Sequence, residues 1–259
     1  MSSALFVLAA PIALLAVYLA HRFGGTAGCA RLPALGFAAT VLAGGVALAA
    51  AIAVILAGPL TSPAIGIGQV ALVLRLDTLS VTLFLLVAFI GCVVMRYSRN
   101  YLDGDPGQGR FFGDLSLTLA AGMLLVLAGN VWHLLAAWIA TSPALHRLLL
   151  FYPERPKAIA AARKKFVTAR LGDVALAVAA VLLVQAFGTA DIGMMLSAAA
   201  APSFEAGAGV TAACVLIAIA ALLKSAQFPT HGWLIEVMET PTPVSALLHA
   251  GIVNAGGFL

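Results

Sequence analysis

Charged residues are what this sequence has least of: only 9% of its 259 residues are Asp, Glu, Lys or Arg, whereas 63% are hydrophobic. Soluble domains contain about 25% charged residues and about 45–50% apolar ones. A folded soluble chain of this size cannot bury so much apolar surface. The composition, with a mean hydropathy of +1.08, therefore excludes a soluble enzyme, a disordered tail and a nucleic-acid-binding module, so no nucleic acid is expected as a partner.

Residue patterns for metal, cofactor or nucleophilic chemistry are also missing. The three cysteines, Cys29, Cys92 and Cys214, lie far apart in apolar runs, and no CxxC or Cys/His spacing typical of metal ligands occurs. The sequence contains no nucleophile triad, no cluster of His, Asp and Glu, and no glycine-rich phosphate loop. We therefore expect no metal, no cofactor and no self-contained enzyme, and we interpret the cysteines as small packing residues.

Long apolar runs are abundant instead, and a helix needs about 17–25 such residues to cross a bilayer. Their uniform apolar character, without period-2 alternation, favours helices over barrel strands. We expect an all-α polytopic membrane protein with about eight transmembrane helices, the seventh broken, in a single membrane domain over residues 1–259. The N-terminal run lacks the basic start of a signal peptide, which favours a retained first span. The expected spans are Ala4–Ala20, Ala34–Ala57, Thr78–Met95, Leu115–Gly129, Val131–Phe151, Val167–Phe187, Val210–Val237 and Pro241–Leu259.

Basic residues are distributed unequally between the connections. Twelve of the 14 Lys and Arg residues follow the first, third and fifth spans, whereas one, Arg75, follows an even-numbered span and Lys224 lies within a span. Basic connections stay on the cytoplasmic side, which predicts a multi-pass membrane protein with its N-terminus outside. The twelve residues are Arg22, Arg31, Arg96, Arg99, Arg110, Arg147, Arg155, Lys157, Arg163, Lys164, Lys165 and Arg170.

Lys224 is the first candidate functional residue. If its helix enters the membrane at Val210, the lysine lies about 14 residues, or ~21 Å, along it. A charged side chain near the bilayer centre costs about 2.5–3.5 kcal/mol on insertion scales. Gln227 and Pro229 follow, and the proline removes an amide donor and should break the helix beside the lysine. The alternative is a lysine that snorkels to an interface, but both interfaces are out of reach at this depth, so an ion path is favoured.

Four further titratable residues are candidates for the same path. His249, ~12 Å into the last span, titrates near neutrality and can pass a proton on; a packed histidine bonded to a carbonyl is the alternative. Asp173, ~9 Å into the sixth span, is either a proton relay or the partner of Arg170 in a local ion pair. Glu236 and Glu239, at the cytoplasmic end of the broken helix, are possible proton-entry residues or simply water-facing acids.

The segment KSAQFPTHGWLIEVMETPTPVSALLHAG, residues 224–251, together with FVTARLGDVALA, residues 166–177, resembles a known signature. It is similar to the proton-translocating antiporter-like subunits of respiratory complex I (subunit L) and of multisubunit cation/proton antiporters (Mrp type). With RLLLFYPERPKAIAAARKKF, residues 147–166, the likeness is strongest to the membrane subunit of the two-component inorganic-carbon pump (DabB type). The resemblance implies that Lys224 is the central protonatable lysine, His249 the helix-eight histidine and Asp173 the helix-six aspartate.

The sequence departs from this family pattern in two ways. Complex I subunits have a glutamate directly after the helix-five tryptophan, where this chain has Ile139, so a complex-I-like ion pair with the lysine is not available there. Family members are also about twice as long, with two inverted five-helix repeats. Residues 115–259 would cover most of the first repeat, so we expect a fragment or a shortened protein.

Three functions are open at this point. The first is a transporter subunit in the lipid bilayer that conducts protons or another cation and drives inorganic-carbon (CO2/bicarbonate) uptake by a zinc-containing, carbonic-anhydrase-like peripheral subunit (DabA type). The second is a proton-pumping subunit of NADH–quinone oxidoreductase or of a multisubunit cation/proton antiporter. The third is a structural fragment without an ion path. Carbon as the substrate is implied by the resemblance alone.

Overall fold

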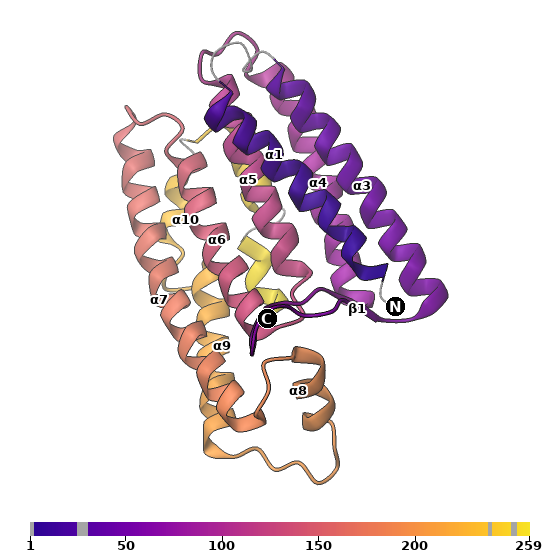
Figure 1. Cartoon of the computed structure of the whole chain (residues 1–259). Helices are drawn as coiled ribbons and strands as arrows, with labels where there is room; N and C mark the ends of the chain where they lie inside the picture. The colour runs from indigo at the N-terminus through magenta and orange to yellow at the C-terminus, as the bar shows by residue number, and fades with distance from the viewer. Residues whose placement is uncertain (1–2, 25–30, 238–239, 250–252) are drawn as a thin grey trace.

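The computed structural model describes residues 3–24, 31–237, 240–249 and 253–259, and these form a bundle of helices (Figure 1). Five helical stretches in this part of the chain are long and apolar enough to cross a membrane. They are the turn η1 (Ser3–Leu8) with α1 (Ala9–Phe23), α3 (Leu32–Ala57), α4 (Thr78–Tyr101), α5 (Gln108–Val126) and α7 (Pro156–Phe187). With α6 (Val131–Leu149) and the shorter apolar helix α9 (Ala208–Lys224), they confirm the all-α polytopic prediction.

Two helices begin where the sequence predicted, because each has a capping residue. The Asn130 side chain accepts from the Trp132 N–H at the start of α6. At the start of α4, Asp77 and Ser80 form a reciprocal capping box. Burial alone would raise the pKa of Asp77, but the Ser80 N–H and the Arg75 guanidinium, 2.8 Å away, together hold it below its ordinary value.

The start of α7 is a correction. The apolar run predicted a span from Val167, but the helix begins at Pro156. Proline fits the first turn of a helix because its φ is already helical and its missing N–H is not needed there. Alanines follow it, which are the strongest helix formers. The basic segment assigned to a connection is therefore helical, and Asp173 lies deeper in the helix than expected.

Four short strands that the sequence analysis did not predict lie between α3 and α4. β1 (Leu60–Thr61) pairs antiparallel with β4 (Arg75–Leu76), and β2 (Ile65–Ile67) pairs antiparallel with β3 (Val70–Leu72). The residue after β3, Val73, accepts from the Gly129 N–H at 2.8 Å and contacts His133 Nδ1 at 2.9 Å. The strands therefore fix the turn between α5 and α6.

The C-terminal part differs from the predicted eighth span. Instead of one helix over Pro241–Leu259, the described residues form α11 (Thr242–Leu247) and a 3-10 turn, η4 (Val253–Phe258). Glycines such as Gly256 and Gly257 have low helix propensity, which disfavours a long helix here. The remaining helices are α8 (Ile192–Ala199), between α7 and α9, and α10 (Gly232–Glu236).

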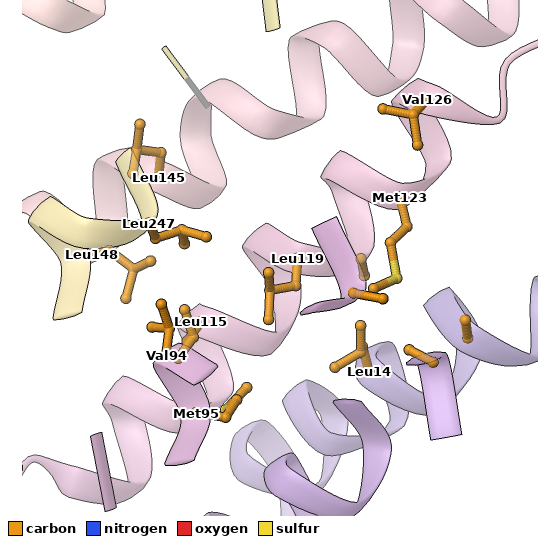
Figure 2. Close-up of a cluster of buried hydrophobic side chains, with 14 of the residues drawn as sticks. Leu14, Val94, Met95, Leu115, Leu119, Met123, Val126, Leu145, Leu148 and Leu247 are labelled. Atoms are coloured by element: carbon orange, nitrogen blue, oxygen red, sulfur yellow. The ribbon is translucent and has the colours of Figure 1, made fainter. Parts of the chain in front are cut away.

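The core joins the first helices to the last (Figure 2). Leu14 of α1, Met95 of α4 and Leu119 of α5 are fully or almost fully buried in it. Leu247 of α11 lies beside Leu145 of α6 in the same cluster. Although α11 is short, its buried face therefore packs into a cluster that it shares with α4 and α6.

The outer faces of the bundle are apolar. Ile55 on α3 is 81% exposed and Phe89 on α4 is 67% exposed. Exposed side chains of this size on spanning-length helices suit lipid rather than water. Together with the five long apolar helices, they define a multi-pass membrane protein.

Successive long helices run in opposite directions, so their connections alternate between the two ends of the bundle (Figure 1). Arg22 and Arg31 flank the connection between α1 and α3, Arg99 and Arg110 lie near that between α4 and α5, and Arg155 precedes α7. We call the end of the bundle at which these arginines lie the basic end. β1 and α8 lie at the other end (Figure 1).

Candidate functional site

Lys224 is the last residue of α9 and is buried, with 8% of its surface exposed. Its amine donates to Thr141 Oγ1 at 2.7 Å and to the Trp138 carbonyl at 3.2 Å, both on α6. The amine also lies 4.4 Å from the centroid of a Trp138 ring, where a cation is attracted to the face of the indole. The described contacts of the lysine amine are thus neutral oxygen acceptors and an aromatic face.

The predicted break of the seventh helix is confirmed at this point. α9 ends at Lys224, and the chain is irregular until α10 begins at Gly232. Ala226 has a φ of 50°, which no α-helix accommodates, and Gln227 donates its N–H to the Leu222 carbonyl. Pro229 lies within the break. Non-helical backbone at membrane depth is tolerated where it is buried in protein or lines a water-filled cavity.

The acceptors of Lys224 lie near the middle of α6, which runs from Val131 to Leu149. The helix contains Pro143, whose missing N–H leaves the Ile139 carbonyl without its usual helical partner. The lysine amine is therefore held at mid-height of the bundle, beside a stretch of α6 that has a spare carbonyl.

Asp173 is buried on α7, with its carboxylate 2.6 Å from the Arg170 guanidinium. This is the local ion pair that the sequence left as an alternative. Asp173 also attracts Lys224 across the interface of α7 and α9. The two helices are in close contact here, since a Cβ on Gly172 would lie at van der Waals distance, 3.6 Å, from the Ala220 carbonyl oxygen of α9. The structure thus brings Asp173 and Lys224 into one buried cluster.

Lys165 belongs to the same cluster and was missed by the sequence analysis, which assigned it to a basic connection. Only 5% of it is exposed, and its amine donates to the Ser142 carbonyl at 2.9 Å and to Ser142 Oγ at 3.0 Å. Its spacing from Ala169, Gly172 and Asp173 is four, seven and eight residues, which is one face of a helix. Extending the buried face of the sixth span backwards would have found it.

The other predicted site residues lie outside this cluster or outside the described side chains. His249 follows α11 and is exposed on the surface of this chain. Glu236 is the last residue of α10, but its side chain is not among those described, and Glu239 lies outside the described residues. Roles for these three residues remain predictions.

A second set of charged groups lies near the basic end and was also missed. Asp114 on α5 is 1% exposed, and Arg147 of α6 binds it at 2.7 Å. Arg110 lies 3.7 Å from the other carboxylate oxygen. The ring of His21 of α1 packs directly on Gly113 of α5, where a Cβ would clash with it. Because Asp114 and Arg147 are 33 positions apart, no local pattern pointed to the pair.

Ionisable side chains buried in a multi-pass bundle beside a broken helix are features of ion-translocating membrane proteins. Comparison with known proteins agrees with this class. The family described as "NADH:quinone oxidoreductase/Mrp antiporter, TM" matches residues 128–259, and the chain belongs to this family. The N-terminal region of complex I chain 5 matches residues 64–112.

Curated relatives point in two directions within this family. A "probable inorganic carbon transporter subunit DabB2" of Halothiobacillus neapolitanus is 45% identical over 194 residues, which cover 75% of this chain and 35% of the relative. A NADH-quinone oxidoreductase subunit L of Mycobacterium tuberculosis is 41% identical over 192 residues, 74% of this chain and 30% of the relative. The chain thus spans about a third of the length of these relatives.

Among solved structures, one chain of the Mrp complex of Dietzia sp. superposes with a TM-score of 0.80 at 32% identity. The match covers 98% of this chain and 27% of that one. The overall helix arrangement is therefore that of antiporter-like subunits.

Proposed function

We propose that this chain is part of an energy-coupled inorganic-carbon uptake system, in which it conducts protons or another cation through a path that contains Lys224. The observation that carries the proposal is the Lys224 amine, buried at mid-height and held only by neutral acceptors among the contacts described. A fixed structural cation is usually paired with a carboxylate when it is buried. A lysine whose described contacts are neutral oxygens and an indole can lose and regain its proton without breaking an ion pair, since Asp173, which attracts it from α7, already binds Arg170.

Asp173 and His249 are the remaining members of the proposed path. Asp173 attracts Lys224 from α7, and His249 would relay protons from the exposed end of α11. We assign Gln227 and Pro229 to the break that gives water access to the lysine, and Glu236 and Glu239 to proton entry. The basic end would face the cytoplasm of a bacterial inner membrane and the N-terminus the outside, which is the orientation that the positive-inside rule favours.

The carbon substrate is supported by the names of three curated relatives, each a probable inorganic carbon transporter subunit that is 41–45% identical to this chain. The proposed partner is a zinc-containing, carbonic-anhydrase-like peripheral subunit of the DabA type, which would hydrate CO2 in the cytoplasm while cation flow through this chain drives the reaction. This chain itself would be a transporter subunit rather than an enzyme.

The test is growth in air of a bacterial host that lacks carbonic anhydrase, after co-expression of this chain with a DabA-type partner. Rescue is expected with the wild type and with Lys164→Gln, whose lysine is exposed beside Lys165, but not with Lys224→Gln. Rescue that survives Lys224→Gln would contradict the ion path. If the full-length relative from Halothiobacillus neapolitanus also fails to rescue growth, the carbon assignment is wrong.

A proton-pumping subunit of NADH–quinone oxidoreductase or of a multisubunit antiporter is the second candidate. It is favoured by the subunit L relatives and by the likeness to the Mrp complex. Copurification of this chain with quinone-reductase subunits from its native membrane would support this candidate over carbon uptake.

A further inference from the structure

Two buried lysines from different helices are bound by adjacent residues of α6. Thr141 Oγ1 accepts from the Lys224 amine at 2.7 Å, and Ser142 accepts from the Lys165 amine through both Oγ and its carbonyl. Consecutive Cα atoms are about 3.8 Å apart. Both amines are therefore held by the same turn of α6, and the two lysines repel each other when both are charged.

The charge around this pair is not balanced among the described residues. Asp173 is the carboxylate that acts on both lysines, and it already binds Arg170 at 2.6 Å. His146 of α6 also faces Lys165 and brings no negative charge. With both lysines protonated, three cationic side chains would share one carboxylate in a buried site.

Burial disfavours the charged form of a lysine, and a like charge nearby disfavours it again. We propose that Lys165 and Lys224 form a coupled pair of amines, only one of which is protonated at a time. Lys165 accepts protons from the basic end and passes them to Lys224, which we call its loading role. The coupling between the two amines does not depend on the proposed function, whereas the loading role of Lys165 rests on that function.

The position of Lys165 gives the direction of loading. Lys165 lies eight residues closer to the start of α7 than Asp173, or ~12 Å along the helix, and α7 begins at the basic end. A proton from water there forms an N–H bond at Lys165. The doubly charged pair then loses a proton from Lys224 to water on the other side, and the proton left on Lys165 passes to the free Lys224 amine. One N–H bond forms for each one that breaks.

The coupling is measured by NMR of the chain labelled with 13Cε-lysine in lipid nanodiscs, in which the Lys165 and Lys224 signals are followed against pH. Lys165→Gln is expected to move the midpoint of the Lys224 signal up by about one pH unit, since removal of the like charge favours the Lys224 ammonium. Lys165→Arg keeps a positive charge and is expected to leave the midpoint at or below its wild-type position. Lys164→Gln is the exposed control and should change nothing.

A Lys224 midpoint that Lys165→Gln leaves unchanged, or that glutamine and arginine both raise, would overturn the pair. Ser142→Ala provides a second route if Lys165→Gln does not fold. Loss of the hydroxyl should move the Lys165 midpoint down and the Lys224 midpoint up. A purely structural role of Ser142 would move the Lys165 midpoint alone.

Proton uptake into vesicles separates this inference from the proposed function. Coupled midpoints without any flux that depends on Lys224 would refute the proposed path and the loading role while leaving the amine pair in place. Flux that depends on Lys224 but not on Lys165, with uncoupled midpoints, would leave the path standing and refute the inference.

Discussion

Replacing Thr141 with valine tests the geometry around Lys224 in the least disruptive way, because valine has a similar shape and lacks the acceptor. The hydroxyl accepts from the amine at 2.7 Å, and hydrogen bonds to charged groups contribute about 1.5–3 kcal/mol. The Trp138 carbonyl and ring remain as partners, so the lower value, ~1.5 kcal/mol, is the appropriate one. Since 1.36 kcal/mol corresponds to one pH unit, the ammonium form of Lys224 should become roughly tenfold less favoured.

The assay is proton uptake into vesicles that contain the chain, followed with an internal pH dye over a series of external pH values. The alkaline limb of the flux profile is expected to move about one pH unit towards acid in Thr141→Val, and Thr141→Ser should restore it. Thr118→Val is the matched control, because Thr118 is also buried and its hydroxyl donates to the Asp114 carbonyl of α5 at 2.8 Å. An unchanged limb in Thr141→Val, or the same shift in Thr118→Val, would refute the reasoning.

Three further substitutions test packing and charge placement. Gly256→Ala places a Cβ against the Ser225 hydroxyl and the Ala221 carbonyl at the end of α9 and should cost about 1–3 kcal/mol of stability. The loss would be measured as a lower unfolding temperature in detergent. Gly257→Ala is the control, because a Cβ there meets open space and should leave the unfolding temperature unchanged. Asp114→Ala removes the buried carboxylate from two partly exposed arginines, with an expected loss of about 1–2 kcal/mol; an equal loss for exposed Asp103→Ala would contradict this. The lowered pKa of Asp77 gives stability that is present above its unfolded pKa of about 3.9 and is lost as the pH falls through the lower folded value. The difference in unfolding temperature between wild type and Asp77→Asn should therefore shrink below about pH 5, and a constant difference would count against it.

Features set by local sequence were predictable. The starts of α4 and α6 follow from Asp77 and Asn130, whose side chains cap the next turn. The break after Lys224 follows from Pro229, which acts within its own segment. A lone lysine in an apolar run was enough to identify the centre of the candidate site.

Features set by contacts between distant segments were not predictable. The burial of Lys165 depends on where α7 begins and on Ser142 of α6, 23 positions away. The Asp114–Arg147 pair and the strands around Val73 likewise depend on the packing of separate segments. Hydropathy finds the lengths of helices, but it does not show which polar side chains meet inside the bundle.

Proton uptake by vesicles that contain this chain, compared between wild type and Lys224→Gln, tests the central claim most directly. The buried, neutrally held amine predicts flux in the wild type and in Lys164→Gln, and flux no higher than that of empty vesicles in Lys224→Gln. Flux that Lys224→Gln retains in full, or wild-type vesicles that behave like empty ones, would contradict the claim that Lys224 carries protons through this chain.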